Sequence, residues 1–194
     1  MLVLGIDPGS RYLGYGLVEW RANKATHVSS GVVRADGKAP LHQRLGTIFS
    51  QLQQVVNVFK PDAVAVEGVF THKNSRSALI LGHARGLALL LADQAGLAVH
   101  EYAPARVKKS VGAGGNDSKD SVARMVERLL HLTEPLERED AYDALAVALC
   151  HVHQLKVPRI KAPGGDDVGR ARRKGEVSGT FLSRLKPALV RAAT

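Results

Sequence analysis

Two acidic residues directly follow apolar segments of strand length, where a charged side chain is unusual. Asp7 comes after the apolar run 2–6, and Glu67 comes after the shorter run 63–66. A carboxylate at such a position is costly to desolvate unless it is paired or bound to a metal. We therefore expect Asp7 and Glu67 to have a partner. Taken alone, Asp7 stands before a Pro-Gly pair and could instead be an ordinary turn former.

A second acidic pair, Asp140 and Asp143, has the spacing that puts both carboxylates on one face of a helix. Their mutual repulsion would destabilise that helix, and a divalent cation would offset the repulsion. In a simpler interpretation, they join Glu137 and Glu139 in a solvated first turn, where carboxylates interact favourably with the helix dipole. That interpretation leaves the coincidence with Glu67 unexplained.

Together the four carboxylates have the chemistry of a site for hard divalent cations. Oxygen ligands suit Mg²⁺, and Mn²⁺ can substitute for it. Four carboxylates can hold one ion or two, and two ions about 3.5–4 Å apart stabilise both the attacking and the leaving oxygen in phosphodiester hydrolysis. The residue types therefore predict metal-dependent phosphodiester chemistry, with Asp7, Glu67, Asp140 and Asp143 as the catalytic residues and the metal ligands.

Hydrophobic periodicity predicts the elements that must position these residues. We expect strands at residues 2–6, 14–19, 27–33, 63–66 and 97–102, and helices at 40–59, 74–94, 104–111, 122–130 and 137–155. The first three strands follow one another with short polar breaks and so predict an antiparallel meander. The later strands alternate with helices, which is typical of an α/β fold. Asp117 is expected to cap the helix at 122–130.

Composition and charge limit the class of protein and its partners. The chain has 194 residues, 45% of them hydrophobic, and a formal net charge of +9, which indicates one domain with a polyanionic partner. No apolar run approaches the length of a membrane span, so we expect no membrane association. A single cysteine and the absence of a signal-like N-terminus favour a cytoplasmic location.

The basic charge is concentrated after Pro158. The last 37 residues carry nine basic and three acidic side chains and are rich in glycine and arginine. We therefore expect a globular domain at 1–157 and a basic, flexible tail at 158–194 that binds DNA without sequence preference.

Five segments in order along the chain resemble the successive motifs of the RuvC family of bacterial Holliday-junction resolvases. They are GIDPG at 5–9, GYG at 14–16, VEGVF at 66–70, LGHARG at 81–86 and DAYDALA at 140–146. The resemblance implies an RNase H-like fold, an α/β fold with a five-stranded mixed sheet flanked by helices. It also implies a homodimer that makes paired, Mg²⁺-dependent nicks in two like-polarity strands of a four-way DNA junction. The nicks would leave 5′-phosphate and 3′-hydroxyl ends, and the partner would be the RuvA-RuvB branch-migration complex.

Residue by residue, the resemblance assigns the acidic quartet to Asp7, Glu67, Asp140 and Asp143. Phe70 resembles the family's aromatic residue that stacks on unpaired bases, although by itself it could be a core residue. Lys108 and Lys119 resemble the family's phosphate-contacting lysines. Further basic residues that could extend the same DNA-binding surface, or could simply be solvated, are Lys109, Lys73, Arg76 and Arg85.

Some residues and functions remain open at this level. The small residues Ala78, Gly82 and Gly86 lie on one helical face and suit either a dimer interface or packing within the chain. His151 and His153 beside Cys150 fall short of any zinc pattern and are interpreted as structural. The alternative functions are hydrolysis of an RNA:DNA hybrid and junction binding without cleavage. An actin-like ATP-binding protein is disfavoured because the chain holds no second copy of the first motif.

Overall fold

The structure, a computed structural model, describes residues 1–68, 75–112 and 119–155, without the side chains of residues 75, 76, 119 and 120. The strands are β1 (Leu2–Asp7), β2 (Tyr12–Arg21), β3 (Lys24–Arg34), β4 (Ala63–Glu67) and β5 (Ala98–Tyr102). The helices are α1 (Leu41–Phe59), α2 (Ser75–Gln94), α3 (Pro104–Ser110), α4 (Lys119–Leu130) and α5 (Glu139–Leu155). Every helix and strand expected from the periodicity is present.

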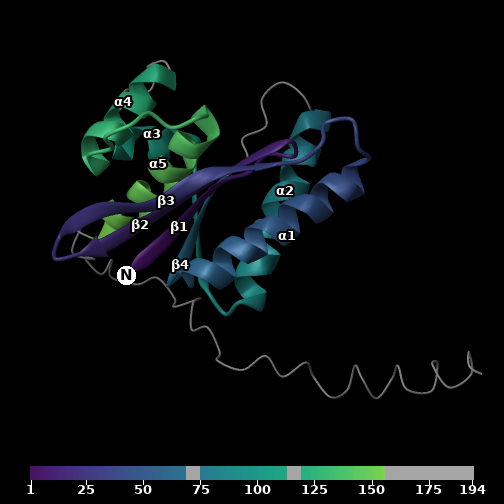
Figure 1. The fold of residues 1–194 in the computed structure, drawn as a ribbon, viewed down its shortest axis with the longest axis horizontal. Helices are drawn as coiled ribbons and strands as arrows, with labels where there is room; N and C mark the ends of the chain where they lie inside the picture. The colour runs from purple at the N-terminus through teal and green to yellow at the C-terminus, as the bar shows by residue number, and fades with distance from the viewer. Residues whose placement is uncertain (69–74, 113–118, 156–194) are drawn as a thin grey trace, which may run out of the picture. The chain divides into compact units, whose positions relative to one another are not determined.

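The strands form one mixed sheet in the order β3-β2-β1-β4-β5 (Figure 1). β1, β2 and β3 pair antiparallel, as the meander predicted, and β4 pairs parallel with both β1 and β5. The expected α/β architecture with a five-stranded mixed sheet is confirmed. Because β1 and β4 are parallel neighbours, their C-terminal ends, at Asp7 and Glu67, lie at the same edge of the sheet.

The β2–β3 hairpin is longer than the sequence suggested. The polar segment 21–24, expected to be a break, contributes its outer residues to the two strands and leaves only Ala22 and Asn23 as the turn. Both residues have positive φ angles, 49° and 61°, as in the two-residue turns that match the twist of a hairpin. Alanine seldom adopts this conformation, which is why local composition did not indicate so tight a turn.

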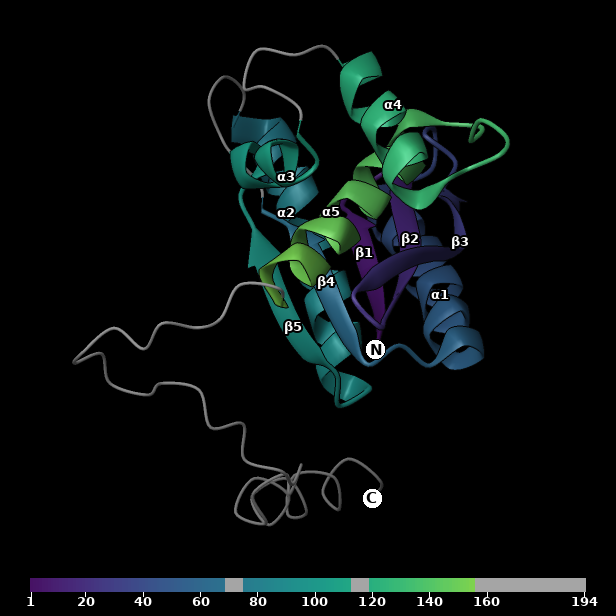
Figure 2. The same cartoon turned by 90° about the vertical axis from the view of Figure 1, so that its left-hand side faces the viewer.

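Helices cover both faces of the sheet and create two hydrophobic cores (Figures 1 and 2). On one face α1 and α2 pack over Leu4 and Ile6 of β1. On the other face α5, with α3 and α4 beside it, packs over Val3. Successive side chains of β1 therefore alternate between the two cores, as the pleat of a strand buried on both faces requires.

Helix α5 crosses the sheet (Figure 2), and glycines in the strands beneath it let its backbone come close. A Cβ atom at Gly5 would overlap the Ala144 carbonyl oxygen, and one at Gly14 would overlap the Asp140 carbonyl oxygen. Gly16 lies in the same way under Leu145, whose side chain would come within 2.7 Å of an added Cβ. The glycines of the first two motifs thus set the distance between the sheet and the helix that carries Asp140 and Asp143.

Three expectations concern residues outside the described ranges. The Asp117 cap, the DNA-binding roles of Phe70 and Lys73, and the basic tail at 158–194 with its domain boundary stay predictions. No helix among the described residues is both long and apolar enough to cross a membrane.

We predict that Gly14→Ala lowers the free energy of unfolding by about 1–3 kcal/mol, because the added methyl group overlaps the backbone of α5. Gly46→Ala is the matched control, since a Cβ there meets no atom of the described chain within 4 Å and lies inside helix α1. The control should raise stability by about 0.5–1 kcal/mol. Urea denaturation measures both variants, and equal effects would contradict the packing argument.

Candidate active site

The pleat of two parallel strands places Asp7 and Glu67 on the face covered by α5. Ile6 and Val66 are partners in the parallel β1–β4 register, and both side chains belong to the α1–α2 core. The next residue of each strand must point to the opposite face, toward α5. The Asp7 and Glu67 side chains are accordingly hydrogen-bonded to each other. The sequence predicts a partner for each of these two carboxylates. In the structure, Asp7 and Glu67 are partners of each other.

Helix α5 brings the second acidic pair to the same place. Asp7 pairs with Gly14 across the β1–β2 ladder, and Gly14 lies against the Asp140 carbonyl group. The first turn of α5 is thereby held beside Asp7. The negative charges of Asp140 and Asp143 both act on the Asp7 carboxyl group, and that of Asp143 also acts on Glu67. The four carboxylates separated by up to 136 positions in the chain thus share one site.

Burial and mutual repulsion raise the pKa of two of these carboxyl groups. Burial is the largest cause for Asp7, followed by the charges of Glu67, Asp143 and Asp140, and together they raise its pKa to about 8. Burial and then the charge of Asp143 raise the pKa of Glu67 to about 7, opposed by the Asp7 hydrogen bond and by Lys108. At neutral pH the Asp7 carboxyl therefore keeps its proton and donates a hydrogen bond to the Glu67 side chain.

These shifts show a site with an excess of negative charge, which is the electrostatic condition that a divalent cation relieves. The donor set, four carboxylates, is the one that Mg²⁺ and Mn²⁺ prefer. Within residues 1–68, 75–112 and 119–155, no three acidic, histidine or cysteine side chains already converge as ligands of one ion. The residues fit a divalent cation by their chemistry and charge.

Arg138 also belongs to the site, and the sequence analysis did not single it out. Its Nε donates a hydrogen bond to Asp140 Oδ2 at 2.9 Å. Its guanidinium carbon lies 3.7 Å from the centroid of the Tyr12 ring. A basic residue two positions before Asp140 was the available signal, but the spacing alone does not tell whether the two side chains meet.

The predicted DNA-contacting residues differ in how much the structure describes of them. Lys108, in the last turn of α3, lies near enough to Glu67 to lower its pKa, and its neighbour Lys109 is exposed. Lys119 and Arg76 lie at the beginnings of α4 and α2, and their side chains are not described. Phe70 and Lys73 lie outside the described residues. Arg85, a further basic candidate, is paired with Glu101 of β5.

The histidines near Cys150 hold α5 to its neighbours. His151 is buried, and its Nδ1 lies 2.7 Å from the Tyr102 hydroxyl of β5. Burial and then the charge of His100 lower the pKa of His151 to about 4, so the ring is neutral at physiological pH. His153 Nδ1 donates to the Ser110 carbonyl at 2.9 Å. These contacts agree with the structural interpretation of both residues.

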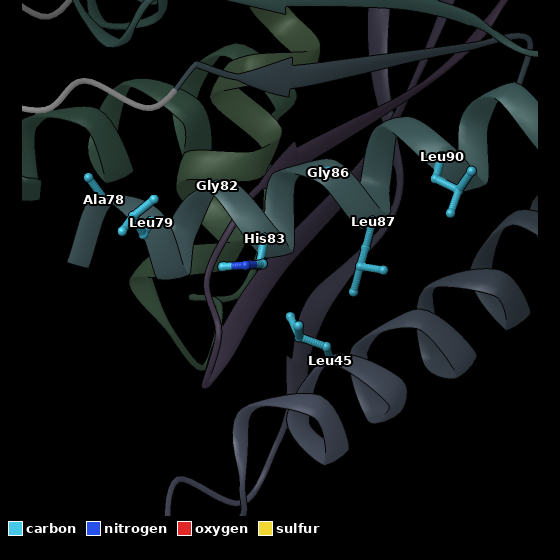
Figure 3. A pocket seen from close by; sticks show the side chains of 8 residues that line it. All are labelled: Leu45, Ala78, Leu79, Gly82, His83, Gly86, Leu87 and Leu90. Atoms are coloured by element: carbon cyan, nitrogen blue, oxygen red, sulfur yellow. The ribbon is translucent and has the colours of Figure 1, made fainter. Parts of the chain in front are cut away.

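A second feature lies on the opposite side of the sheet, along α2. Figure 3 shows Leu45 of α1 and Leu87 of α2 pointing toward each other beneath an open, apolar groove. Gly82 and Gly86 form part of its wall, and a Cβ atom at either would meet no atom of the described residues within 4 Å. Leu79 of the same groove is 66% exposed. Gly82 and Gly86 therefore face outward, and a side chain at either position would not pack against the described chain.

The fold and the site define an RNase H-like α/β protein with a carboxylate site suited to divalent cations. The sequence model of the family described as crossover junction endodeoxyribonuclease RuvC matches residues 3–151. The chain is 53% identical to crossover junction endodeoxyribonuclease RuvC of Myxococcus xanthus, over 97% of this chain and 96% of the relative. It is 48% identical to that of Halorhodospira halophila, over 84% and 96%.

Solved structures agree with the sequence comparisons. Thermus thermophilus RuvC superposes with a TM-score of 0.70 and 37% identity, over 80% of this chain and 95% of that one. The T. thermophilus RuvC in complex with a Holliday junction substrate gives 0.72 and 35%, with the same coverage. The chain belongs to the RuvC family of crossover junction endodeoxyribonucleases. The expected family, fold class and enzyme class, a hydrolase, are confirmed.

We predict that stability without divalent cations falls as the pH rises from about 4 to about 8. In this window the folded state keeps protons on Asp7 and Glu67 that the unfolded chain, with pKa values of 3.8 and 4.5, has released. Asp7→Asn should remove much of this dependence and raise stability at pH 8. The measurement is urea denaturation at several pH values in the presence of a chelator.

Asp93→Asn, in an exposed position on α2, is the control for that experiment and should keep the wild-type pH dependence. A wild-type slope in Asp7→Asn would show that the pair is ionised in the folded state.

Proposed function

We propose that this protein resolves four-way DNA junctions by nicking two strands of like polarity at symmetric positions. Hydrolysis of the phosphodiester would leave 5′-phosphate and 3′-hydroxyl ends. The observation that carries the proposal is the carboxylate cluster at the shared edge of β1 and β4, in a chain of the RuvC family. A related protein of the same fold, T. thermophilus RuvC, has been solved with a Holliday junction substrate.

Asp7, Glu67, Asp140 and Asp143 are proposed as the catalytic residues that hold the metal, one or two Mg²⁺ ions per subunit or Mn²⁺ in their place. When bound, the cation supplies an activated water and stabilises the charge that develops on the phosphate oxygens. Asp7 and Glu67 share one proton, and this proton must be released when the ion binds to their carboxyl groups. Lys108, close to Glu67, is placed to bind a phosphate that approaches the site.

The DNA-binding surface extends this site along α3 and the neighbouring helix starts. Lys108 and Lys109 contribute adjacent charges on α3. Lys119, Arg76 and Lys73 are proposed to contact phosphates, and Phe70 to stack on bases that are unpaired at the junction centre. The basic tail from Pro158 is proposed to add sequence-independent contacts. We propose a cytoplasmic location, which agrees with a DNA substrate.

We also infer a homodimer that pairs through the apolar groove of α2. A four-way junction has two equivalent scissile strands, and a two-fold dimer offers two equivalent active sites. A glycine inside a helix costs about 1 kcal/mol relative to alanine, and the outward-facing Gly82 and Gly86 would let another backbone come close. The RuvA-RuvB branch-migration complex is the proposed further partner, by family membership.

One experiment separates this function from its alternatives. The protein is incubated with Mg²⁺ and either a synthetic four-way junction or an RNA:DNA hybrid. Paired nicks in the junction support the proposal. Cleavage of the hybrid alone would favour an RNA:DNA hybrid hydrolase, and binding without cleavage would favour a junction-binding protein.

We predict that Asp7→Asn, Glu67→Gln, Asp140→Asn and Asp143→Asn each abolish nicking and leave junction binding intact. Each amide keeps the shape of the side chain but loses the charge that holds a cation. Gel shifts and cleavage assays on the same preparations measure the two properties. Near-normal cleavage by any one variant would remove that residue from the quartet.

Dimer formation provides a separate prediction. Leu79→Asp places a charge in the apolar groove of α2 and should lower the mass in sedimentation from twice the chain mass to 20.8 kDa. Val58→Asp, on α1 outside that groove and 72% exposed, is the matched control and should remain dimeric. A monomeric wild-type protein that still makes paired nicks would refute the dimer.

A further inference from the structure

Arg138 is held by two residues at the rim of the carboxylate site. Its Nε donates to Asp140 Oδ2 at 2.9 Å, and its guanidinium group stacks over Tyr12 at 3.7 Å from the ring centroid. Asp140 is in the first turn of α5, and Tyr12 is the first residue of β2. The contact therefore pairs Asp140, an expected metal ligand, with the positively charged side chain of Arg138.

The backbone around Arg138 is also fixed. Its carbonyl oxygen accepts a hydrogen bond from the Ala141 N–H at 3.2 Å, which joins Arg138 to the first turn of α5. The preceding residue, Glu137, forms an ion pair with Arg34 at the end of β3. Arg138 thus reaches Asp140 from an anchored position, and its planar guanidinium matches the carboxylate.

A divalent cation and Arg138 compete for the same carboxylate. Of the three negative charges that raise the pKa of Asp7, that of Asp140 has the smallest effect. Asp140 is not among the causes that shift the pKa of Glu67. Within the described residues no three candidate ligands converge. A cation that takes Asp140 as a ligand places a second positive charge beside the Arg138 guanidinium, and this repulsion weakens or breaks the bond to Asp140.

We propose that Arg138 is a positioning residue: an internal counter-ion of Asp140 that a divalent cation displaces on binding. The inference rests on the proposed metal site. Displacement leaves the guanidinium over Tyr12 without its carboxylate partner, and a guanidinium at this rim can bind a DNA phosphate bidentately. Binding of the cation is thereby coupled to the release of a phosphate-binding group next to it.

The test measures Mn²⁺ binding without DNA, as the dissociation constant, the half-saturating concentration, fitted to the rise of the melting temperature with Mn²⁺ concentration. The Arg138–Asp140 side chains are 34% and 25% exposed, so the pair is of modest strength. Arg138→Gln should lower the Mn²⁺ concentration at half-saturation by about two- to fivefold. Tyr12→Leu, which removes only the support of the guanidinium, should lower it by a smaller factor and provides a second route if Arg138→Gln folds poorly.

Arg34→Gln is the matched control because it breaks the adjacent ion pair with Glu137 and leaves Asp140 untouched. Its half-saturating concentration should equal that of the wild type. The inference is overturned if Arg138→Gln behaves like Arg34→Gln, or if it needs more Mn²⁺, since Arg138 would then orient Asp140 as a ligand. Asp143→Asn distinguishes a failure of the inference about Arg138 from a failure of the proposed metal site. If Mn²⁺ stabilises this variant as much as the wild type, the metal site itself is refuted together with the inference.

Discussion

The close approach of α5 to the sheet is the constraint on which the rest of the molecule depends. Gly5, Gly14 and Gly16 leave room for the backbone and small side chains of the helix, and no larger residue fits there without moving it. This packing fills one of the two cores, and it also carries the first turn of α5 over the end of β1. Stability and the assembly of the acidic site therefore depend on the same contact.

The packing of α5 on the sheet brings acidic side chains together, and their mutual repulsion is unfavourable. Burial and the neighbouring carboxylates raise the pKa of Asp7 and of Glu67, and these two side chains share a proton. Two basic side chains relieve part of the repulsion, Lys108 beside Glu67 and Arg138 beside Asp140. Protons, basic side chains and divalent cations are all attracted by the same excess of negative charge. A site that holds a proton and pairs with basic side chains is therefore also suited to a divalent cation.

The two faces of the sheet have separate roles. The α5 face holds the carboxylates, and the α1–α2 face carries an apolar groove with outward-facing glycines. In the proposed dimer, the sheet would separate the surface that pairs with a second copy from the surface that meets DNA. Because every strand lies in one sheet, a dimer built on α2 would fix the spacing of its two active sites.

The sequence alone determined the elements and the identity of the acidic quartet. Periodicity depends on burial, and a strand or helix buried on known faces shows its pattern locally, as in 2–6 and 40–59. The family motifs supplied the order of the carboxylates. The tertiary structure decided how residues that are distant in the sequence lie relative to one another. It shows the proton shared by Asp7 and Glu67 and the contact of Arg138 with Asp140 and Tyr12. It also shows that Gly82 and Gly86 face outward. These depend on which strand lies beside which and on how closely a helix packs, and no local pattern of residue types contains those distances.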